Sequence, residues 1–480
     1  MTGRFKTRLA LCFLALLLGN ALATERALAQ TTAGREPPFM PLRFMEDVRA
    51  YCEEPEDTVG IDLKCLRPRG PDGPIVSFGG ELKWKFEAAR SPGFGFAADD
   101  VVYPLQRVLV HADARLTPNV RAFVQIGHHV RYGSDTLARP SDESDVDLQQ
   151  GFVDLFWRKG PDDGWVVRLG RQELGFGSTR FVGAREGANL RLSFDAALVS
   201  WQSPNRHRVD VFAGRPMANS RGAFDDSGDD ERAFWGVYTT TRLWGQSSFP
   251  ERPADQALSL DLYYLGFENE RARFRDGVGA EQRAAFGARL FGRVGDLDLD
   301  WEAQVQRGRL AASDIRAWTI ATDTGWTFPA ATWSPRLGLR ADIASGDATA
   351  NDGELGSLQP LFASPAYFSE AALVGPVNLM SLNPHVTLTP RPGVRLQAGW
   401  NALWKAEAAD AFYRPGPVAV PGTAGGERRI GHQSWVGLSA SLTRNLTVSA
   451  SVVHFEAGPA VTQGGGEDVD YATVSLKTQF

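Results

Sequence analysis

The sequence has only one long apolar run, and it lies at the very start. Residues 9–18 are apolar throughout, but no later segment of the 480-residue chain approaches the roughly 20 apolar residues that a transmembrane helix needs. Long stretches with helical hydrophobic periodicity are missing as well. These two absences exclude a helical membrane protein and a helical bundle.

Cysteine and histidine are scarce, with 3 and 7 residues. The sequence contains no H-E-x-x-H, G-x-S-x-G, phosphate-binding loop or EF-hand spacing, and the adjacent His128 and His129 would face opposite sides of a strand. Asp347 and Asp352 share a polar loop that could hold calcium, although their spacing matches no established site. We therefore predict a protein that is not an enzyme and has no cofactor or metal. A surface-acting barrel hydrolase is the enzymatic alternative.

Basic residues are outnumbered, since 51 lysines and arginines face 57 aspartates and glutamates for a formal net charge of −6. The first 29 residues hold four basic side chains and one acidic, so their removal makes the remaining chain more acidic still. A nucleic-acid partner would require a basic face for its phosphates. The charge balance therefore excludes nucleic acid as the partner.

The N-terminus has the pattern of a secretory signal peptide, which we place at residues 1–29. A basic start precedes the apolar run, and A-x-A cleavage motifs end at Ala23 and at Ala29. We favour cleavage after Ala29, because the stretch between the two motifs continues the polar end of the signal, while the earlier site stays open. An apolar run of about ten residues is too short for an uncleaved membrane anchor.

Residues 30–74 contain several prolines and the two cysteines that would survive cleavage, Cys52 and Cys65. An exported protein matures in an oxidising compartment, so we predict a Cys52–Cys65 disulfide, with two free thiols as the alternative. The segment is predicted to be a periplasmic lead-in or a small plug.

From Ile75 onward apolar and polar residues alternate, which predicts β-strands. In the first strand Val76, Phe78, Leu82, Trp84 and Phe86 alternate with Ser77, Glu81, Lys83, Lys85 and Glu87. Such alternation fits a soluble sandwich as well as a membrane barrel, but the connections separate the two. Tight turns near residues 160–164, 203–205, 294–296, 390–393 and 443–445 alternate with long polar loops near 175–187, 216–231, 345–376, 406–427 and 458–468.

Outer-membrane barrels place short turns in the periplasm and long loops outside. Residues 75–480 are therefore predicted to form an all-β, transmembrane antiparallel barrel of about 18 strands, whose water-filled lumen is narrowed by loops. The last segment, 471–480, alternates and ends on Phe480, which resembles the recognition signal of the outer-membrane assembly machinery. The expected location is the bacterial outer membrane.

Inward positions of the predicted barrel are rich in charge. The basic positions are Lys83, Arg107, Arg115, Arg121, Arg131, Arg168, Arg283, Arg289, Arg336, Arg340 and Arg395, and the acidic ones are Asp113, Asp298, Asp300 and Glu302. Arginine rings favour anions, because guanidinium keeps its charge and binds carboxylates in a bidentate manner. The alternative for any single residue is a cross-strand ion pair that only stabilises the wall.

One stretch resembles the signature of the alginate export family of outer-membrane proteins. It comprises residues 151–155, 168–174, Gly177, Arg180, Gly183, Arg185, Asn189, Arg191 and 193–195. Residues 335–339 and 344–347 and the pair Asn378-Leu379 are also similar to family members.

The resemblance implies an 18-stranded barrel, lined by arginines, through which a polyuronate leaves the periplasm. Arg171 would sit at the constriction, with Arg168, Arg180 and Arg191 as basic neighbours and Asp195 as an acidic counterweight. Gln149 and Gln150 stand where the family's exporter carries arginine, and Leu373 or Val374 replaces another, so the cargo stays open.

We therefore predict a passive, anion-selective channel that exports an acidic, alginate-like polysaccharide, with a porin for small organic anions or nutrients as the alternative. The expected site residues are Arg171, Arg168, Arg180, Arg191, Asp195, Lys83, Arg131, Arg336 and Arg340. The expected partners are outer-membrane lipid and lipopolysaccharide, the barrel-assembly machinery, the anionic saccharide and periplasmic secretion proteins. The protein is predicted to act as a monomer.

Overall fold

The computed structural model describes residues 39–40, 42–46, 61–70, 73–96, 100–133, 139–160, 163–204, 207–245, 256–274 and 277–480. The predicted signal peptide and Cys52 lie outside these residues. Cys65 is disulfide-bonded, and the predicted pairing with Cys52 stays a prediction. In the part of the chain that the structure describes, no helix is long and apolar enough to cross a membrane.

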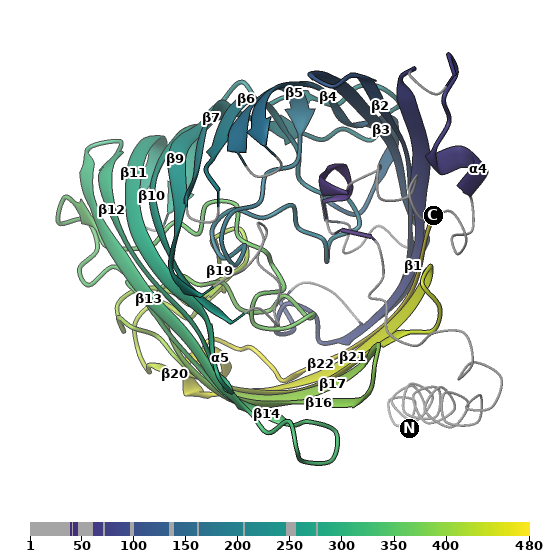
Figure 1. Cartoon of the computed structure of the whole chain (residues 1–480). Helices are drawn as coiled ribbons and strands as arrows, with labels where there is room; N and C mark the ends of the chain where they lie inside the picture. Colours follow the sequence, from purple (N-terminus) through teal and green to yellow (C-terminus); the bar gives the residue numbers. More distant parts are fainter. Residues whose placement is uncertain are drawn as a thin grey trace.

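Eighteen long antiparallel strands form a closed barrel (Figure 1). Each long strand pairs with the next one along the chain, and the last strand returns to pair with the first. The long strands are β1 (Ile75–Arg90), β2 (Val101–Thr117), β3 (Val120–Arg131), β4 (Ser144–Gly160), β5 (Asp163–Gln172), β6 (Phe194–Gln202), β7 (His207–Ala218), β9 (Arg232–Gly245), β10 (Ala257–Phe274), β11 (Gly277–Val294), β12 (Leu297–Leu310), β13 (Ser313–Thr327), β14 (Arg336–Ala344), β16 (Leu379–Arg391), β17 (Val394–Trp404), β20 (Arg429–Ser441), β21 (Leu446–Ala457) and β22 (Val469–Gln479).

The remaining elements are short. They are η1 (Arg43–Met45), α4 (Ile61–Lys64), β8 (Ser227–Gly228), β15 (Glu354–Leu355), β18 (Tyr413–Arg414), β19 (Val418–Ala419) and α5 (Pro459–Thr462). Counting the alternating segments therefore predicted the strand number correctly. Each strand has a lipid-facing side and needs an apolar residue only at every second position, so it can be recognised in the sequence.

The tight turns lie at one end of the barrel, together with the C-terminus, and this end is the periplasmic one. Most connections at the other end are long. The predicted alternation of short and long connections is wrong at several places, however. The periplasmic connection from the end of β9 at Gly245 to the start of β10 at Ala257 is long, and two extracellular connections are short. Strand β10 ends at Phe274 and β11 begins at Gly277, while β12 ends at Leu310 and β13 begins at Ser313.

The two faces of each strand differ as the alternation predicts. On β1, Phe78 and Phe86 are exposed on the outer face, whereas Glu81 and Glu87 are buried on the inner face. An apolar residue exposed at every second position is what a lipid-facing wall requires. Segments 234–238 and 318–328, in which aromatic and threonine residues obscure the alternation, also form strands. They lie in β9 and in or at the end of β13.

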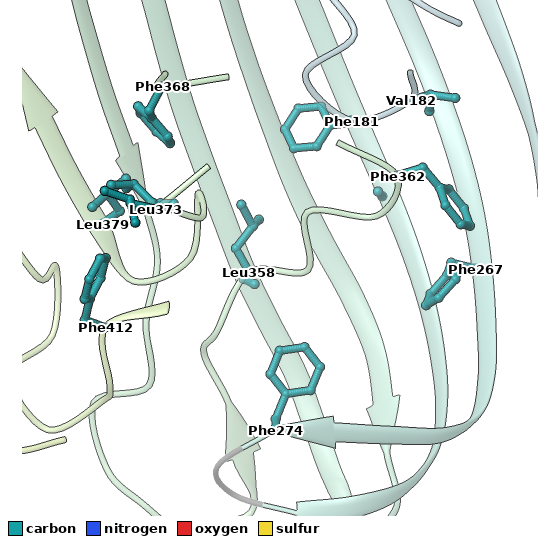
Figure 2. Packing of buried hydrophobic residues seen from close by; sticks show 14 of the residues in the cluster. Phe181, Val182, Phe267, Phe274, Leu358, Phe362, Phe368, Leu373, Leu379 and Phe412 are labelled. Carbon is teal, nitrogen blue, oxygen red and sulfur yellow. The ribbon is translucent and has the colours of Figure 1, made fainter. Parts of the chain in front are cut away.

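The extracellular half of the lumen is packed rather than open. Two long loops, residues 173–193 between β5 and β6 and residues 345–378 between β14 and β16, fold into the barrel; we call them together the loop layer. Their apolar side chains form one buried cluster with residues of the wall, including Phe181, Val182, Leu358, Phe362 and Phe267 (Figure 2). Apolar loop residues that face no lipid have to be buried against each other, which explains this core.

Part of the N-terminal lead-in lies inside the barrel, where η1 is seen within the ring of strands (Figure 1). Phe44 packs edge-on against Phe152, with ring centroids 5.5 Å apart, and against Phe123. Arg121 donates a hydrogen bond to the Phe44 carbonyl at 2.8 Å. We call residues 42–46 the plug, and the predicted role of the whole segment 30–74 stays a prediction.

Gly170 on β5 offers a test of the wall's geometry. Its φ is +128°, and a Cβ at this position would lie 2.3 Å from the Gly151 carbonyl oxygen of β4. We expect Gly170→Ala to lower the yield of folded barrel severalfold, because strain and backbone clash add up. Heat-modifiable migration on gels measures the folded fraction. Gly437→Ala on β20, where a Cβ would make only an ordinary contact of 3.9 Å with the Ala450 carbonyl oxygen, is the matched control, and equal yields of the two variants would contradict the expectation.

Candidate permeation site

Below the loop layer lies a cavity of about 1550 Å³ that is bounded by the periplasmic halves of the strands and by the plug. A second cavity of about 430 Å³ continues from it between the loop layer and strands β12 to β14. The two share lining residues such as Asp323, Arg336 and Arg340. Together they form an interior space that a solute entering from the periplasm meets first.

The large cavity is basic although the whole chain is acidic. Among the described residues, fourteen lysines and arginines line it, against nine aspartates and glutamates, while the chain as a whole carries a formal charge of −6. The negative charge is therefore placed elsewhere. A low-dielectric wall with a positive excess attracts anions and repels cations.

Side chains of the β5–β6 loop tie it to the opposite wall. Glu186 is the centre of this contact, because its carboxylate binds Arg107 at 2.8 Å, Arg191 and, more distantly at 3.7 Å, Lys477. Burial alone would raise the pKa of Glu186, but the guanidinium groups of Arg107 and Arg191 hold this pKa well below its usual range. The loop thus stays anchored while Glu186 is ionised.

The two loops of the layer meet at Gly187. A Cβ on Gly187 would lie 3.6 Å from the Ala366 Cβ of the β14–β16 loop. Lys85 of β1 joins both loops, since its Nζ donates to the Gly187 carbonyl at 3.2 Å and lies 3.7 Å from the Glu370 carboxylate. This meeting point narrows the lumen at the boundary between cavity and loop layer.

Arg185, two residues before Gly187, differs from the other arginines near the cavity. Its side chain lines the cavity but makes no hydrogen bond or ion pair with any described residue, and its Nε is buried without a partner. Its backbone has φ +58°, an unusual conformation for a residue with a side chain. Burial and the nearby Arg232 lower the pKa of Arg185 to about 10, so the group is still a cation at neutral pH.

Tyr367 organises the basic residues on the other side. Its hydroxyl accepts from Arg180 at 3.0 Å and donates to Asp342 at 2.7 Å. The guanidinium of Arg340 lies 4.9 Å from the centre of the same ring, and Arg336 binds Asp298 and Asp323 at 2.6 and 2.9 Å. Carboxylates hold these arginines in fixed positions, and every guanidinium nitrogen of Arg336 and Arg340 already has a partner.

Most of the predicted site residues lie in this interior. Lys83, Arg168, Arg191, Arg336 and Arg340 line the large cavity, and Arg180 lines the smaller one, where it is paired with Glu302 at 2.5 Å. Arg131 is buried in the wall outside both linings, over the ring of Tyr103 and 3.8 Å from Asp142. Six of the nine predicted site residues thus line the two cavities, and their role in permeation stays a prediction.

The prediction that Arg171 sits at the constriction is not supported by its position. Arg168 lines the cavity, and Arg171, three residues along β5, lies on the opposite face of the strand, where its side chain is only 12% exposed and 3.9 Å from Asp147. It binds Asp195 at 2.9 Å and the Leu148 carbonyl at 3.1 Å. Arg171 and Asp195 form an ion pair at the extracellular end of β5 and β6.

Gln149 and Gln150, which replace an expected arginine, hold the root of the β5–β6 loop. A bulge in the pairing of β3 with β4 lets both amides reach the interior. Gln149 donates to Ser193 at 2.7 Å, and Gln150 accepts from the Glu173 backbone at 3.2 Å. Leu373 and Val374 are likewise buried in the loop-layer core. These exchanges strengthen the loop layer instead of lining the cavity.

The alginate export family model matches residues 75–475, which is nearly the whole barrel. The chain belongs to the alginate export family. With the closed barrel, this membership makes the protein a channel of the bacterial outer membrane, and nothing in the family or the fold is that of an enzyme. No match was found among curated protein sequences.

Solved structures with the same fold include several porins. OccK8 (OprE) of Pseudomonas aeruginosa has 11% identity and a TM-score of 0.56, over 84% of this chain and 98% of its own. OpdK of the same organism, solved with vanillate, has 13% identity and a TM-score of 0.55 over 84% and 98%. OccAB1 of Acinetobacter baumannii has 11% identity and a TM-score of 0.57 over 84% and 96%. At identities of 11 to 13%, these structures show only that this chain has the same fold as they do.

Proposed function

We propose that the protein is an anion-selective channel through which an acidic polysaccharide leaves the periplasm. The observation that carries the proposal is the basic excess of the cavity lining in a chain of net negative charge. The cavity lies on the periplasmic side, where an exported polymer would enter. Periplasmic secretion proteins would supply the polymer at that end.

The passage of the polymer requires fixed cations at more than one depth. Arg168 lies near the plug, Arg185 next to the meeting point of the loops, and Arg340 beside the second cavity. Successive carboxylates of a polyuronate would exchange their water for these guanidinium groups in turn. Neighbouring acids such as Asp298 and Asp323 keep each contact weak enough to release.

Uptake of small organic anions is the second candidate, and the packed loop layer favours it. The loops are joined by main-chain hydrogen bonds, such as Phe362 N to the Phe181 carbonyl at 2.9 Å, so only a narrow passage suits the layer in this arrangement. OpdK, which shares the fold, was solved with vanillate. A polymer would need the two loops to separate, whereas a small anion needs a smaller separation of the loops.

Planar bilayers distinguish these functions. We expect the reversal potential in a salt gradient to show a preference for chloride over potassium of several-fold, and cation preference would contradict the proposal. Polyuronates of increasing length, added to one side at a time, should block from the periplasmic side with an affinity that rises with length. Block by small carboxylates alone, without length dependence, would instead support uptake.

A further inference from the structure

The outer surface of β12 and β13 carries an arrangement of arginines that the channel function does not use. Arg307 of β12 and Arg316 of β13 lie directly opposite each other in the strand register, and Arg309 is next on the same outer face. All three are exposed. Two like charges directly opposite on neighbouring strands destabilise a sheet, so their placement calls for an anion between them.

The level of these arginines in the membrane follows from the residues below them. One step toward the periplasm, Val305 pairs with Trp318, and both are exposed on the outer face. Trp318 and Trp326, also exposed, are eight positions apart on β13, which spans about 20 Å of membrane thickness at the usual rise and tilt. We take Trp318 as the outer boundary of the apolar band, which places Arg307 and Arg316 just above it.

Local carboxylates do not satisfy all three guanidinium groups. Arg309 is 3.3 Å from Asp314, and Arg316 is 3.1 Å from Glu354, but these pairs are largely exposed and worth little. Arg307 donates to the Gln306 carbonyl at 3.0 Å and has no carboxylate partner among the described residues. A net positive charge therefore remains at the level of the lipid headgroups.

A groove of about 270 Å³ begins beside Arg316 on the same outer face. Its apolar floor consists of Trp318, Ile343 and Met380, from β13, β14 and β16, and loop residues of 346–356 form its upper rim. Four carboxylates line the groove, and each has a local partner. Glu354 binds Arg316 at 3.1 Å and Glu407 binds Arg428 at 3.3 Å, while Asp352 accepts from the Glu354 backbone at 2.9 Å and Asp347 from that of Gly356 at 3.2 Å. The groove therefore joins Arg316 to the exposed apolar side chains of the outer wall.

We propose that Arg307, Arg309 and Arg316 bind the phosphate groups of a phosphorylated glycolipid of the outer leaflet, of the lipopolysaccharide type, with an acyl chain along Trp318. Guanidinium binds phosphate in a bidentate manner, and two facing arginines can share one phosphate. The outer leaflet of this membrane is built from such glycolipids. The bound phosphate would remove the repulsion between Arg307 and Arg316.

The test uses the full-length protein, purified in detergent, and native mass spectrometry to count retained glycolipid. We expect R307Q/R316Q to retain at least fivefold less phosphorylated glycolipid than the unchanged protein. The matched control is R90Q/R271Q, because these two arginines are also exposed at extracellular strand ends but are each paired with an acid. Heat-modifiable migration establishes that every variant is folded.

Further measurements distinguish a bound glycolipid phosphate from free phosphate and from a bound cation. The dephosphorylated glycolipid should bind weakly to all variants, and inorganic phosphate at millimolar concentration should not displace the phosphorylated form. Equal retention by R307Q/R316Q and the unchanged protein would overturn the proposal. Complete displacement of the glycolipid by inorganic phosphate would also overturn the proposal. A third contrary result would be loss of glycolipid binding in EDTA with no effect of the arginine variants. That result would indicate that a cation held by the rim carboxylates binds the glycolipid.

Discussion

A disulfide between residues 187 and 366 should close the channel. In the variant G187C/A366C the two Cβ atoms would lie about 3.6 Å apart, within the range that a disulfide spans. Because the two loops meet at this point, the bond would fix them against each other across the lumen. We expect single-channel conductance to fall at least tenfold on oxidation and to recover when a reductant is added.

Several controls make this result specific. The single variants G187C and A366C should conduct normally under oxidising conditions, and a reductant should leave the conductance of the unchanged protein as it was, despite the disulfide at Cys65. Gly187 does not have a positive φ, so a side chain is tolerated there. If the oxidised double variant conducts like the unchanged protein, the permeation path does not run between the loops.

A reversal of charge at Arg185 should weaken polyuronate block by about tenfold, which corresponds to about 1.4 kcal/mol. The reason is that Arg185 lines the cavity without an acidic partner among the described residues, so its charge is available to the permeating anion. R185E should lower the preference for anions as well. Single-channel recordings with a polyuronate on the periplasmic side measure both effects.

Two further variants separate charge from backbone strain at this position. R185G removes the charge and suits the φ of +58°, so it should weaken block while leaving the folded yield intact or improved. R185K keeps the charge and should block nearly as well as arginine. R293E, near the periplasmic end of β11, is the matched control, since Arg293 lines the wide part of the same cavity. If R185K behaves like R185E, charge is not the cause.

The barrel was predictable because its physical cause is local. A lipid-facing wall imposes alternation on every strand, and a tight turn is recognisable from its glycine, proline and asparagine residues. The same alternation predicts that Arg171 does not share the face of Arg168. Residues 168 and 171 differ by an odd number of positions, so they cannot both face the lumen of a regular strand. The resemblance to the family nevertheless predicted that Arg171 faces the lumen.

The loop layer could not be predicted in the same way. Phe181, Leu358 and Phe362 are apolar residues in loops, which indicates burial, but not which loop buries which. The availability of Arg185 depends on where the carboxylates of other elements end up, and the inward turn of Gln149 depends on a bulge between β3 and β4. Such features arise from contacts between distant parts of the chain.

The plug also affects how the barrel comes apart. Arg43 donates to the Gly80 carbonyl of β1 and to the carbonyl of Phe480, each at 3.0 Å. A residue near the start of the described chain is thus bonded to both sides of the seam where the first and last strands meet. Opening the seam has to break these bonds and the strand pairing together. The two ends of the chain should therefore lose their structure in one cooperative step, and not one after the other.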